Sequence, residues 1–162
     1  MSSFIKNIHV QLVFLCIIII FVDQITKLLV INFFDNRLST HTVRLTFFFN
    51  ITLAWNYGIS FGIFNSSEQN QIIFLVLSTC FIMLFLYCYL RNLFINKLSI
   101  ALIISGAIGN IIDRIHHGAV VDFIDFHLYD HHWPAFNIAD TAIVIGAFLM
   151  IFFNEALTKR YA

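Results

Sequence analysis

Charged residues are scarce in this sequence of 162 residues. Only 11% of the residues are Asp, Glu, Lys or Arg, whereas 60% are hydrophobic and twenty are Phe. A soluble domain of this length would typically carry about 25% charged residues. This deficit, together with the presence of a single proline, excludes an ordinary soluble domain and indicates an integral membrane protein.

Other absences narrow the function. The formal net charge is zero, so the chain lacks the basic footprint of a nucleic-acid-binding protein. Cys16, Cys80 and Cys88 lie inside apolar runs without metal-ligand spacing, which is typical of core or lipid-facing residues. No Ser or Cys lies in a recognisable nucleophile motif, so a serine or thiol peptidase is not supported. No small-residue cleavage site follows the first apolar run, which we interpret as a retained helix.

Four apolar segments are expected to cross a membrane as helices, because a spanning helix needs about 20 residues. They cover residues 8–31, 72–90, 98–113 and 135–153. The basic residues on one side of these segments, offset there only by Glu155, are Lys6, Arg91, Lys97, Lys159 and Arg160. The positive-inside rule therefore predicts that both termini are cytoplasmic. We see no internal repeat and expect one polytopic domain, residues 1–162.

Two segments remain on the outer side. Residues 42–53 alternate apolar and polar side chains with one exception, Phe48, and predict an amphipathic strand. A small sheet is thus expected to lie on the membrane surface with its apolar face down. The fold class is an all-α membrane protein with four transmembrane helices and a small extracytoplasmic β element.

The second outer segment, residues 115–134, holds five of the seven histidines. These are His116, His117, His127, His131 and His132. Zinc binding is one hypothesis, but no pair combines i, i+4 spacing with the Glu of the His-Glu-x-x-His motif of metallopeptidases. His127 and His131 have this spacing, but Pro134 and the aromatic neighbours argue against a helix there. We therefore expect interfacial histidines beside Trp133, with no metal and no cofactor.

Ionisable side chains inside a spanning helix cost roughly 2.5–3.5 kcal/mol each at its centre. They are therefore functional candidates. Asp23 lies deep in the first helix, and Lys27 follows it on the same helical face at i+4, where the two charges partly neutralise each other. Alternatively, such groups lie at helix ends and are exposed to water.

Three further aspartates are expected to meet at the outer interface. The third helix runs outward and ends at Asp113, whereas the fourth runs inward from outside and carries Asp140 near its start. Asp122 lies between these helices in an apolar run. Because these two helices run in opposite directions, we expect the carboxylates of Asp113 and Asp140 to lie at the same depth in the membrane.

Two close carboxyl groups cannot both ionise easily, so one stays protonated while the other is charged. The charged group takes a proton from water and the neutral group donates to a scissile carbonyl, which is general acid–base hydrolysis of a peptide bond. The alternative is a structural pair, or a carboxylate bonded to helix-start amides.

The sequence neighbours of each aspartate favour one choice of catalytic pair but do not decide it. Arg114 would keep Asp113 ionised, which suits an ion-paired scaffold or a substrate contact. Apolar neighbours would desolvate Asp122 and raise its carboxyl pKa. This favours Asp122 with Asp140, and Asp125 remains a competitor.

Five motifs together resemble the bacterial lipoprotein signal peptidases, also called type II signal peptidases. They are DQITK at 23–27, NYG at 56–58, GAIGNIIDR at 106–114, VVDF at 120–123 and FNIAD at 136–140. Each motif is weak alone, but five in order along nearly the whole chain are specific. One departure is Ile59-Ser60, where the family usually has two alanines.

The resemblance implies an aspartic endopeptidase whose catalytic residues are Asp122 and Asp140. The implied substrates are diacylglyceryl-modified prolipoproteins, cut just before the lipidated cysteine at the outer face of the bacterial cytoplasmic (inner) membrane. The residues that it implies for the substrate groove or for support of the pair are Asp23, Lys27, Asn56, Gly58, Asn110, Asp113, Arg114 and Asn137. Membrane lipid is the other expected partner, and a monomer is sufficient.

Two rival functions predict different outcomes. A proton- or cation-coupled transport protein would use the intramembrane aspartates as a relay and would carry charges through the depth of the bundle. The inner halves of the four segments lack Asp, Glu, Lys and Arg, which favours the peptidase. A non-catalytic scaffold would lose stability rather than activity when its aspartates are changed.

Overall fold

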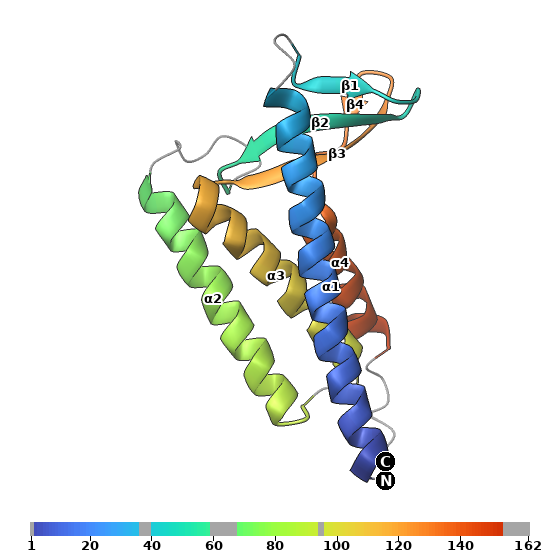
Figure 1. The fold of residues 1–162 in the computed structure, drawn as a ribbon, viewed down its shortest axis with the longest axis vertical. Coiled ribbons are helices and arrows are strands. Elements are labelled where there is room, and N and C mark those ends of the chain that lie inside the picture. Colours follow the sequence, from blue (N-terminus) through green and yellow to red (C-terminus); the bar gives the residue numbers. More distant parts are fainter. Residues whose placement is uncertain (1, 36–39, 59–67, 94–95, 154–162) are drawn as a thin grey trace.

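Four helices and a small sheet make up the fold. The computed structural model describes residues 2–35, 40–58, 68–93 and 96–153, so that Lys159, Arg160 and the Ile59-Ser60 dipeptide lie outside the described residues. The helices are α1 (Ser2–Asp35), α2 (Glu68–Leu90), α3 (Lys97–His117) and α4 (Ile138–Phe152). They run side by side, and the sheet lies at one end of the bundle (Figure 1).

The four helices are those that the apolar segments predict, with different ends. Among the described residues, α1, α2 and α3 are long and apolar enough to cross a membrane, whereas α4 is apolar but has only 15 residues. Helix α4 begins three residues later than expected because Asn137 caps it, and its side chain accepts a hydrogen bond from the backbone N–H of Asp140. Helix α3 continues to His117 and ends at Gly118, which adopts the left-handed conformation.

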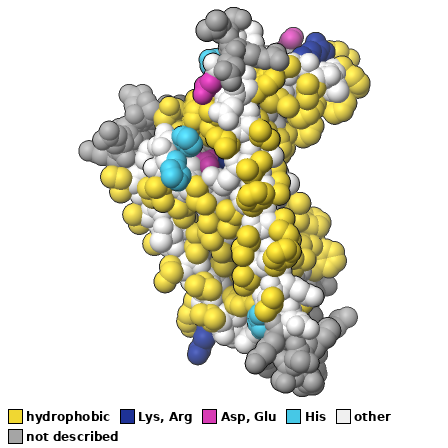
Figure 2. All heavy atoms as spheres, in the orientation of Figure 1, with side chains coloured by type: hydrophobic (Ala, Val, Ile, Leu, Met, Phe, Trp, Pro, Cys, Tyr) yellow, Lys and Arg dark blue, Asp and Glu magenta, His cyan; other side chains and the backbone are white. Residues whose placement is uncertain are grey.

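Hydrophobic side chains make up much of the face of the bundle that Figure 2 shows. In α2, for example, Ile72, Phe81 and Leu90 are all more than half exposed. Such a surface is stable against lipid and not against water. Helix α1 has 34 residues, about 51 Å at 1.5 Å per residue, which exceeds the roughly 30 Å of a bilayer core. Its C-terminal end extends beyond the other helices and supports the sheet (Figure 1).

The sheet is antiparallel and has the strand order β1-β2-β3-β4. The strands are β1 (Thr42–Arg44), β2 (Phe49–Asn56), β3 (Val120–Leu128) and β4 (His131–His132). The prediction of one continuous strand over residues 42–53 was wrong, because this segment forms two strands, β1 and most of β2. The chain reverses at residues 45–48, where the N–H groups of Leu45 and Thr46 both donate to the carbonyl of Phe49 at 3.0 Å. The alternation of apolar and polar residues continues through this turn, so the sequence pattern did not reveal it.

Strand β3 was not predicted as a strand, although its first residues hold Asp122. Val120, Val121 and Phe123 are all buried, so the run has no polar alternation by which a strand could be recognised. Val121 and Phe123 pack with Leu53 of β2 against Val30 and Phe34 near the outer end of α1. This core attaches the sheet to the bundle and fixes β3 above α3 and α4.

Helices α3 and α4 approach each other closely at the glycines of α3. A Cβ atom on Gly106 would lie 2.3 Å from the carbonyl oxygen of Ala139, and one on Gly109 would lie 2.8 Å from a carboxyl oxygen of Asp23. The absence of these side chains lets α1 and α4 both reach the same turn of α3.

Candidate active site

Three buried charges from α1 and α3 form an ion cluster. The ammonium group of Lys27 lies 2.8 Å from Asp23 and 2.7 Å from Asp113, and none of the three residues is more than 2% exposed. Sequence reasoning did not single out Gln24, whose side-chain amide donates to Asp113 at 2.8 Å and to the carbonyl of Gly109 at 3.2 Å. Its polar character within a spanning helix was the available signal. The scaffold role expected for Asp113 fits this geometry, but its ion-pair partner is Lys27 rather than Arg114.

The two aspartates of the ion cluster also bind the backbone at the positions where catalysis was predicted. Asp23 accepts a hydrogen bond from the N–H of Ala139 at 2.8 Å. Asp113 accepts one from the N–H of Val121 at 3.0 Å. Each donor residue directly precedes one of the two predicted dyad aspartates. The ion cluster therefore fixes the β3 backbone and the start of α4 relative to each other.

Asn137 lies between the two predicted dyad aspartates. Its side-chain amide donates to Asp122 at 2.8 Å, and its side-chain oxygen accepts from the N–H of Asp140 at 2.8 Å. In return, Asp140 accepts from the N–H of Asn137 at 3.3 Å, which completes a capping box. Asn137 is fully buried. Asp140 thus makes the helix-start bonds considered as an alternative, and it also shares Asn137 with Asp122.

Neutral amides bind the remaining carboxyl oxygens of the pair. Asn56 donates to Asp122 at 2.9 Å, and Asn110 donates to Asp140 at 2.7 Å. The oxygen of Asn110 accepts in turn from Lys27 at 3.3 Å. Among the described residues, neither carboxyl group of the pair forms an ion pair. No cation of the described residues therefore contacts the pair directly.

The environment of Asp122 favours its protonated form. Burial, and next the nearby charge of Asp140, raise the pKa of Asp122 to about 7, although hydrogen bonds from Asn56 and Asn137 oppose the shift. A carboxyl group with this pKa can hold a proton and release it near neutral pH. This agrees with the desolvation expected from the apolar neighbours of Asp122 in the sequence.

Arg114, Gly58 and Asn56 form one side of the site. The guanidinium of Arg114 lies 5.6 Å from the ring centroid of Phe74 and donates to the carbonyl of Asn110 at 3.3 Å. Gly58 has φ of +109°, and a Cβ there would lie 2.2 Å from the Phe74 ring, so only glycine fits. The N–H of Gly58 donates to the side-chain oxygen of Asn56 at 2.8 Å, which orients the amide that binds Asp122.

Asp125, the competitor for the dyad, lies elsewhere. It accepts hydrogen bonds from Asn50 at 2.7 Å and from His132 at 2.8 Å. Burial alone would raise the pKa of Asp125, but these bonds outweigh burial and lower it. Asp125 therefore belongs to the sheet and not to the carboxyl pair.

A groove of about 380 Å³ lies between α2, α3 and α4 and includes Asn110, which binds Asp140. Its lining is mostly apolar, and its two strongly polar lining residues are Asn110 and Arg114. Asn110 connects the groove to the site because its amide donates to Asp140. Figure 2 shows one face of the bundle, with hydrophobic side chains over the helices and Asp side chains visible near the sheet end.

Four apolar helices and a buried carboxyl pair at one end of the bundle define a membrane peptidase of the aspartic type. The sequence model of the family described as signal peptidase (SPase) II matches residues 15–154. The chain belongs to this family, whose activity is the removal of signal peptides from prolipoproteins.

Individual relatives agree with this assignment. The chain is 39% identical over 162 residues to the lipoprotein signal peptidase of Pelagibacter ubique (strain HTCC1062), covering 96% of this chain and 95% of the relative. It is 37% identical over 145 residues to that of Anaplasma phagocytophilum (strain HZ), covering 88% and 89%. A bacterial membrane enzyme solved by the in meso method at 2.3 Å resolution superposes with a TM-score of 0.73, 29% identity and coverage of 94% and 90%.

Proposed function

We propose that Asp122 and Asp140 carry out the peptide hydrolysis as an acid–base pair. The raised pKa of Asp122 supports its role as the protonated acid that donates its proton to the scissile carbonyl. Asp140 would then be the ionised base that takes a proton from the attacking water and passes it to the leaving amine. Asp122 regains a proton from a hydroxyl group of the tetrahedral intermediate when that intermediate breaks down. Because Asn137 binds both groups, the pair is expected to titrate as one unit.

Asp23, Lys27 and Asp113 support the pair without touching the reacting atoms. Lys27 contacts both carboxylates and offsets part of their charge inside the bundle, where a lone charge would be costly. The ionised carboxylates accept from the backbone directly before each catalytic residue. Asn137 has the same supporting role, because its amide is buried and already bonded within the site.

The groove between α2, α3 and α4 is the proposed site for the apolar segment of the signal peptide. Its apolar lining suits a hydrophobic peptide, and Asn110 and Arg114 mark the end where that peptide would reach Asp140. We propose that the preferred substrates carry diacylglyceryl on cysteine. Such a lipid holds the cysteine at the membrane interface, and the cut would fall just before this residue.

The proposed topology places the sheet and the carboxyl pair at the outer face of the bacterial cytoplasmic membrane. Arg91 and Lys97 support it, because they lie in the turn at the end of the bundle opposite the sheet (Figure 1). Both termini are then cytoplasmic. One polytopic domain is sufficient for the proposed mechanism, because it supplies both aspartates and the amides that bind them.

The observation that carries the proposal is the raised pKa of Asp122 beside Asp140 in a site without a contacting cation. The test is cleavage of a diacylglyceryl-modified prolipoprotein by purified protein in detergent, followed by gel shift and by mass analysis of the new N-terminus. The same precursor with its lipidated cysteine replaced by alanine is the substrate control, and Asp140→Asn is the enzyme control.

We expect the wild type to cut the lipidated precursor before its cysteine, to leave the control precursor intact and to be insensitive to a chelator. Folded Asp140→Asn should be inactive. Equal cleavage of both precursors would refute the substrate assignment, and an active Asp140→Asn would refute the acid–base pair.

A further inference from the structure

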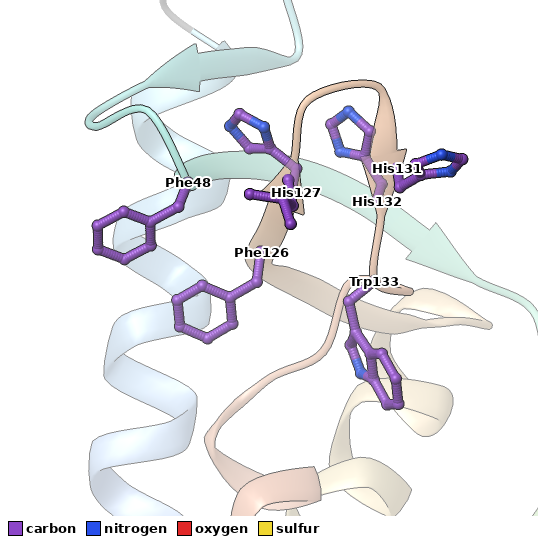
Figure 3. Close-up of a pocket in the computed structure, with 7 residues that line it drawn as sticks. Phe48, Phe126, His127, His131, His132 and Trp133 are labelled. Carbon is purple, nitrogen blue, oxygen red and sulfur yellow. The ribbon is translucent and has the colours of Figure 1, made fainter.

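Two cavities outside the groove differ in the residues that they contact. The larger, about 440 Å³, lies at the far end of the sheet, where Figure 3 shows Phe48 and Trp133 together with three imidazole rings. None of its lining residues belongs to the ion cluster or to the predicted dyad. The smaller, about 240 Å³, lies between α1 and α3, and its wall includes Gln24, Lys27 and Asp113. The smaller cavity therefore lies directly against the groups that support the dyad.

Gln24 points its side-chain nitrogen into the ion cluster. Nε2 lies 2.8 Å from Oδ1 of Asp113, and 3.2 Å from both the carbonyl oxygen of Gly109 and Oδ2 of Asp23. An amide oxygen in this position would face three oxygen atoms, so the nitrogen is the atom that occupies it. The amide has two N–H groups for three acceptors, and the shortest bond goes to Asp113. Gln24 is thus a neutral donor beside two carboxylates and one ammonium group.

The two carboxylate oxygens of Asp113 have different partners. Oδ2 lies 2.7 Å from the ammonium group of Lys27 and accepts from the backbone N–H of Val121 at 3.0 Å. Oδ1 accepts from Gln24. Asp113 is only 2% exposed, so loss of this donor would leave a buried acceptor poorly satisfied and free the carboxylate to rotate. Because Val121 directly precedes Asp122, the orientation of one carboxylate fixes the backbone that carries the other.

Gln24 acts on one of two connections between the ion cluster and the dyad. The first connection runs from Asp113 to the backbone N–H of Val121. The second runs from Oδ1 of Asp23 to the backbone N–H of Ala139. Gln24 binds Asp23 through the other oxygen, Oδ2, and at a longer distance than it binds Asp113. Loss of the Gln24 amide should therefore loosen the first connection and leave the second one intact.

The position of Gln24 keeps it away from the bound substrate. The cavity beside Gln24 and the groove proposed for the signal peptide share no lining residue. Among the described residues, the hydrogen bonds of the Gln24 amide go to Asp23, Asp113 and Gly109, and not to the dyad. Any effect of Gln24 on cleavage must therefore act through another residue.

We propose that Gln24 is a positioning residue for the cleavage reaction. It holds Oδ1 of Asp113, which aligns Oδ2 with the N–H of Val121 and places Asp122 for proton transfer. This inference rests on the catalytic role proposed for Asp122. A misplaced catalytic group lowers kcat, whereas KM depends on the groove that Gln24 does not line. A purely structural role would instead lower stability and leave the kcat of folded protein unchanged.

The first test is hydrogen exchange of the Val121 amide, measured by NMR on detergent-solubilised protein with isotope-labelled valine and alanine. Gln24→Met removes the donor and keeps the length of the side chain. Thr26→Val is the matched control on α1, because the Thr26 hydroxyl binds carbonyl oxygens of its own helix. The Ala139 amide is the internal reference. Exchange at Val121 should be roughly tenfold faster in Gln24→Met alone, with Ala139 unchanged in both variants.

The second test measures kcat and KM on the lipidated precursor. Gln24→Met should lower kcat by up to about 100-fold and change KM by less than about twofold, because a shift of about 1 Å in a catalytic group has an effect of this size. Thr26→Val should change neither. Unchanged Val121 exchange in folded Gln24→Met, or faster exchange with a normal kcat, would overturn the proposal. An active Asp140→Asn would refute the acid–base pair, but it would leave the exchange result standing.

Gln24→Glu tests the donor itself and replaces Gln24→Met if that variant does not fold. An ionised carboxyl group would face Asp23 and Asp113, whereas a protonated one can donate to Asp113 as the amide does. The ratio of its kcat to that of the wild type should therefore rise as pH falls from about 8 to about 5.5. Lys27 and His117, the other titratable groups of the cavity wall, are present in both proteins. A ratio that is independent of pH would contradict the donor role.

Discussion

Two pairs of aspartates lie at the sheet end of the bundle and differ in how their charge is compensated. Asp23 and Asp113 share the buried ammonium group of Lys27. Asp122 and Asp140 are bound only by amides, and no described cation contacts them. The comparison teaches that an aspartate paired with a buried cation acts as part of the scaffold. An aspartate whose hydrogen-bond partners are all neutral is available for proton transfer.

The sharpest test of this comparison replaces one aspartate from each pair. Asp122→Asn should lower the cleavage rate by roughly 10³-fold, within the range of about 10²–10⁴ for loss of a general acid. It should leave the thermal unfolding temperature unchanged or raise it, because it removes a carboxyl group whose charged form is costly. Initial rates on the lipidated precursor and unfolding in detergent measure both quantities.

Asp113→Asn should show the opposite pattern, with a lower unfolding temperature and only an indirect loss of rate. A fully active, folded Asp122→Asn combined with an inactive, stable Asp113→Asn would reverse the assignment of the two pairs.

The next largest effect is expected for Lys27→Met. This change leaves two carboxylates in a buried cluster without their cation, at a cost of about 3–5 kcal/mol in the free energy of unfolding. Arg44→Met on the exposed face of β1 is the control and should change the free energy of unfolding by less than about 0.5 kcal/mol. Similar stability of the two variants in detergent would mean that Lys27 does not hold the scaffold together.

A smaller effect is expected for Gly109→Ala, which tests the packing between the two pairs. The new Cβ would lie 2.8 Å from a carboxyl oxygen of Asp23, so it should cost about 1–3 kcal/mol in stability and also lower the cleavage rate. Gly118→Ala meets open space, but Gly118 has φ of +68°, so only backbone strain of about 1 kcal/mol is expected. Loss of rate in the Gly118 variant alone would contradict the coupling between Asp23 and the start of α4.

The smallest effect concerns pH. The proposed role of Asp122 requires its protonated form, so the cleavage rate should fall as pH rises through about 7, by up to tenfold per pH unit. The folded state also holds this proton more tightly than the unfolded chain. The resulting stabilisation is therefore present at low pH and is lost as pH rises from about 4 to about 7.

Asp122→Asn should remove this pH dependence of stability. Rates from pH 5.5 to 8.5 measure the acid role, and a rate that rises through pH 7 would make Asp122 the base instead.

The parts of the fold with a strong periodic or apolar signal were predicted well. All four helices were found because about 20 apolar residues have few alternatives in a membrane. Strand β3 was missed because both of its faces are buried at Asp122, and the turn at residues 45–48 was hidden because its apolar residues continue the alternation of β1 and β2.

The sequence predicted which residues belong to the candidate site, but it did not predict which of them contact each other. Opposite helix directions were sufficient to expect Asp113 and Asp140 at one depth. They could not show that Lys27 rather than Arg114 would pair with Asp113, because sequence neighbours on a helix point in different directions. Gln24 escaped notice because its role depends on α3, 85 residues further along the chain.

By itself, the sequence determined the membrane class, the four helices, the family motifs and the aspartates available for chemistry, since these depend on composition and local order. Only the tertiary structure decided which aspartates are neutralised and which are not. That outcome depends on the position of the single ammonium group of Lys27 relative to four carboxyl groups from α1, α3, β3 and α4. In a low-dielectric interior, a few ångströms between charges determine whether a carboxyl group stays ionised or keeps its proton.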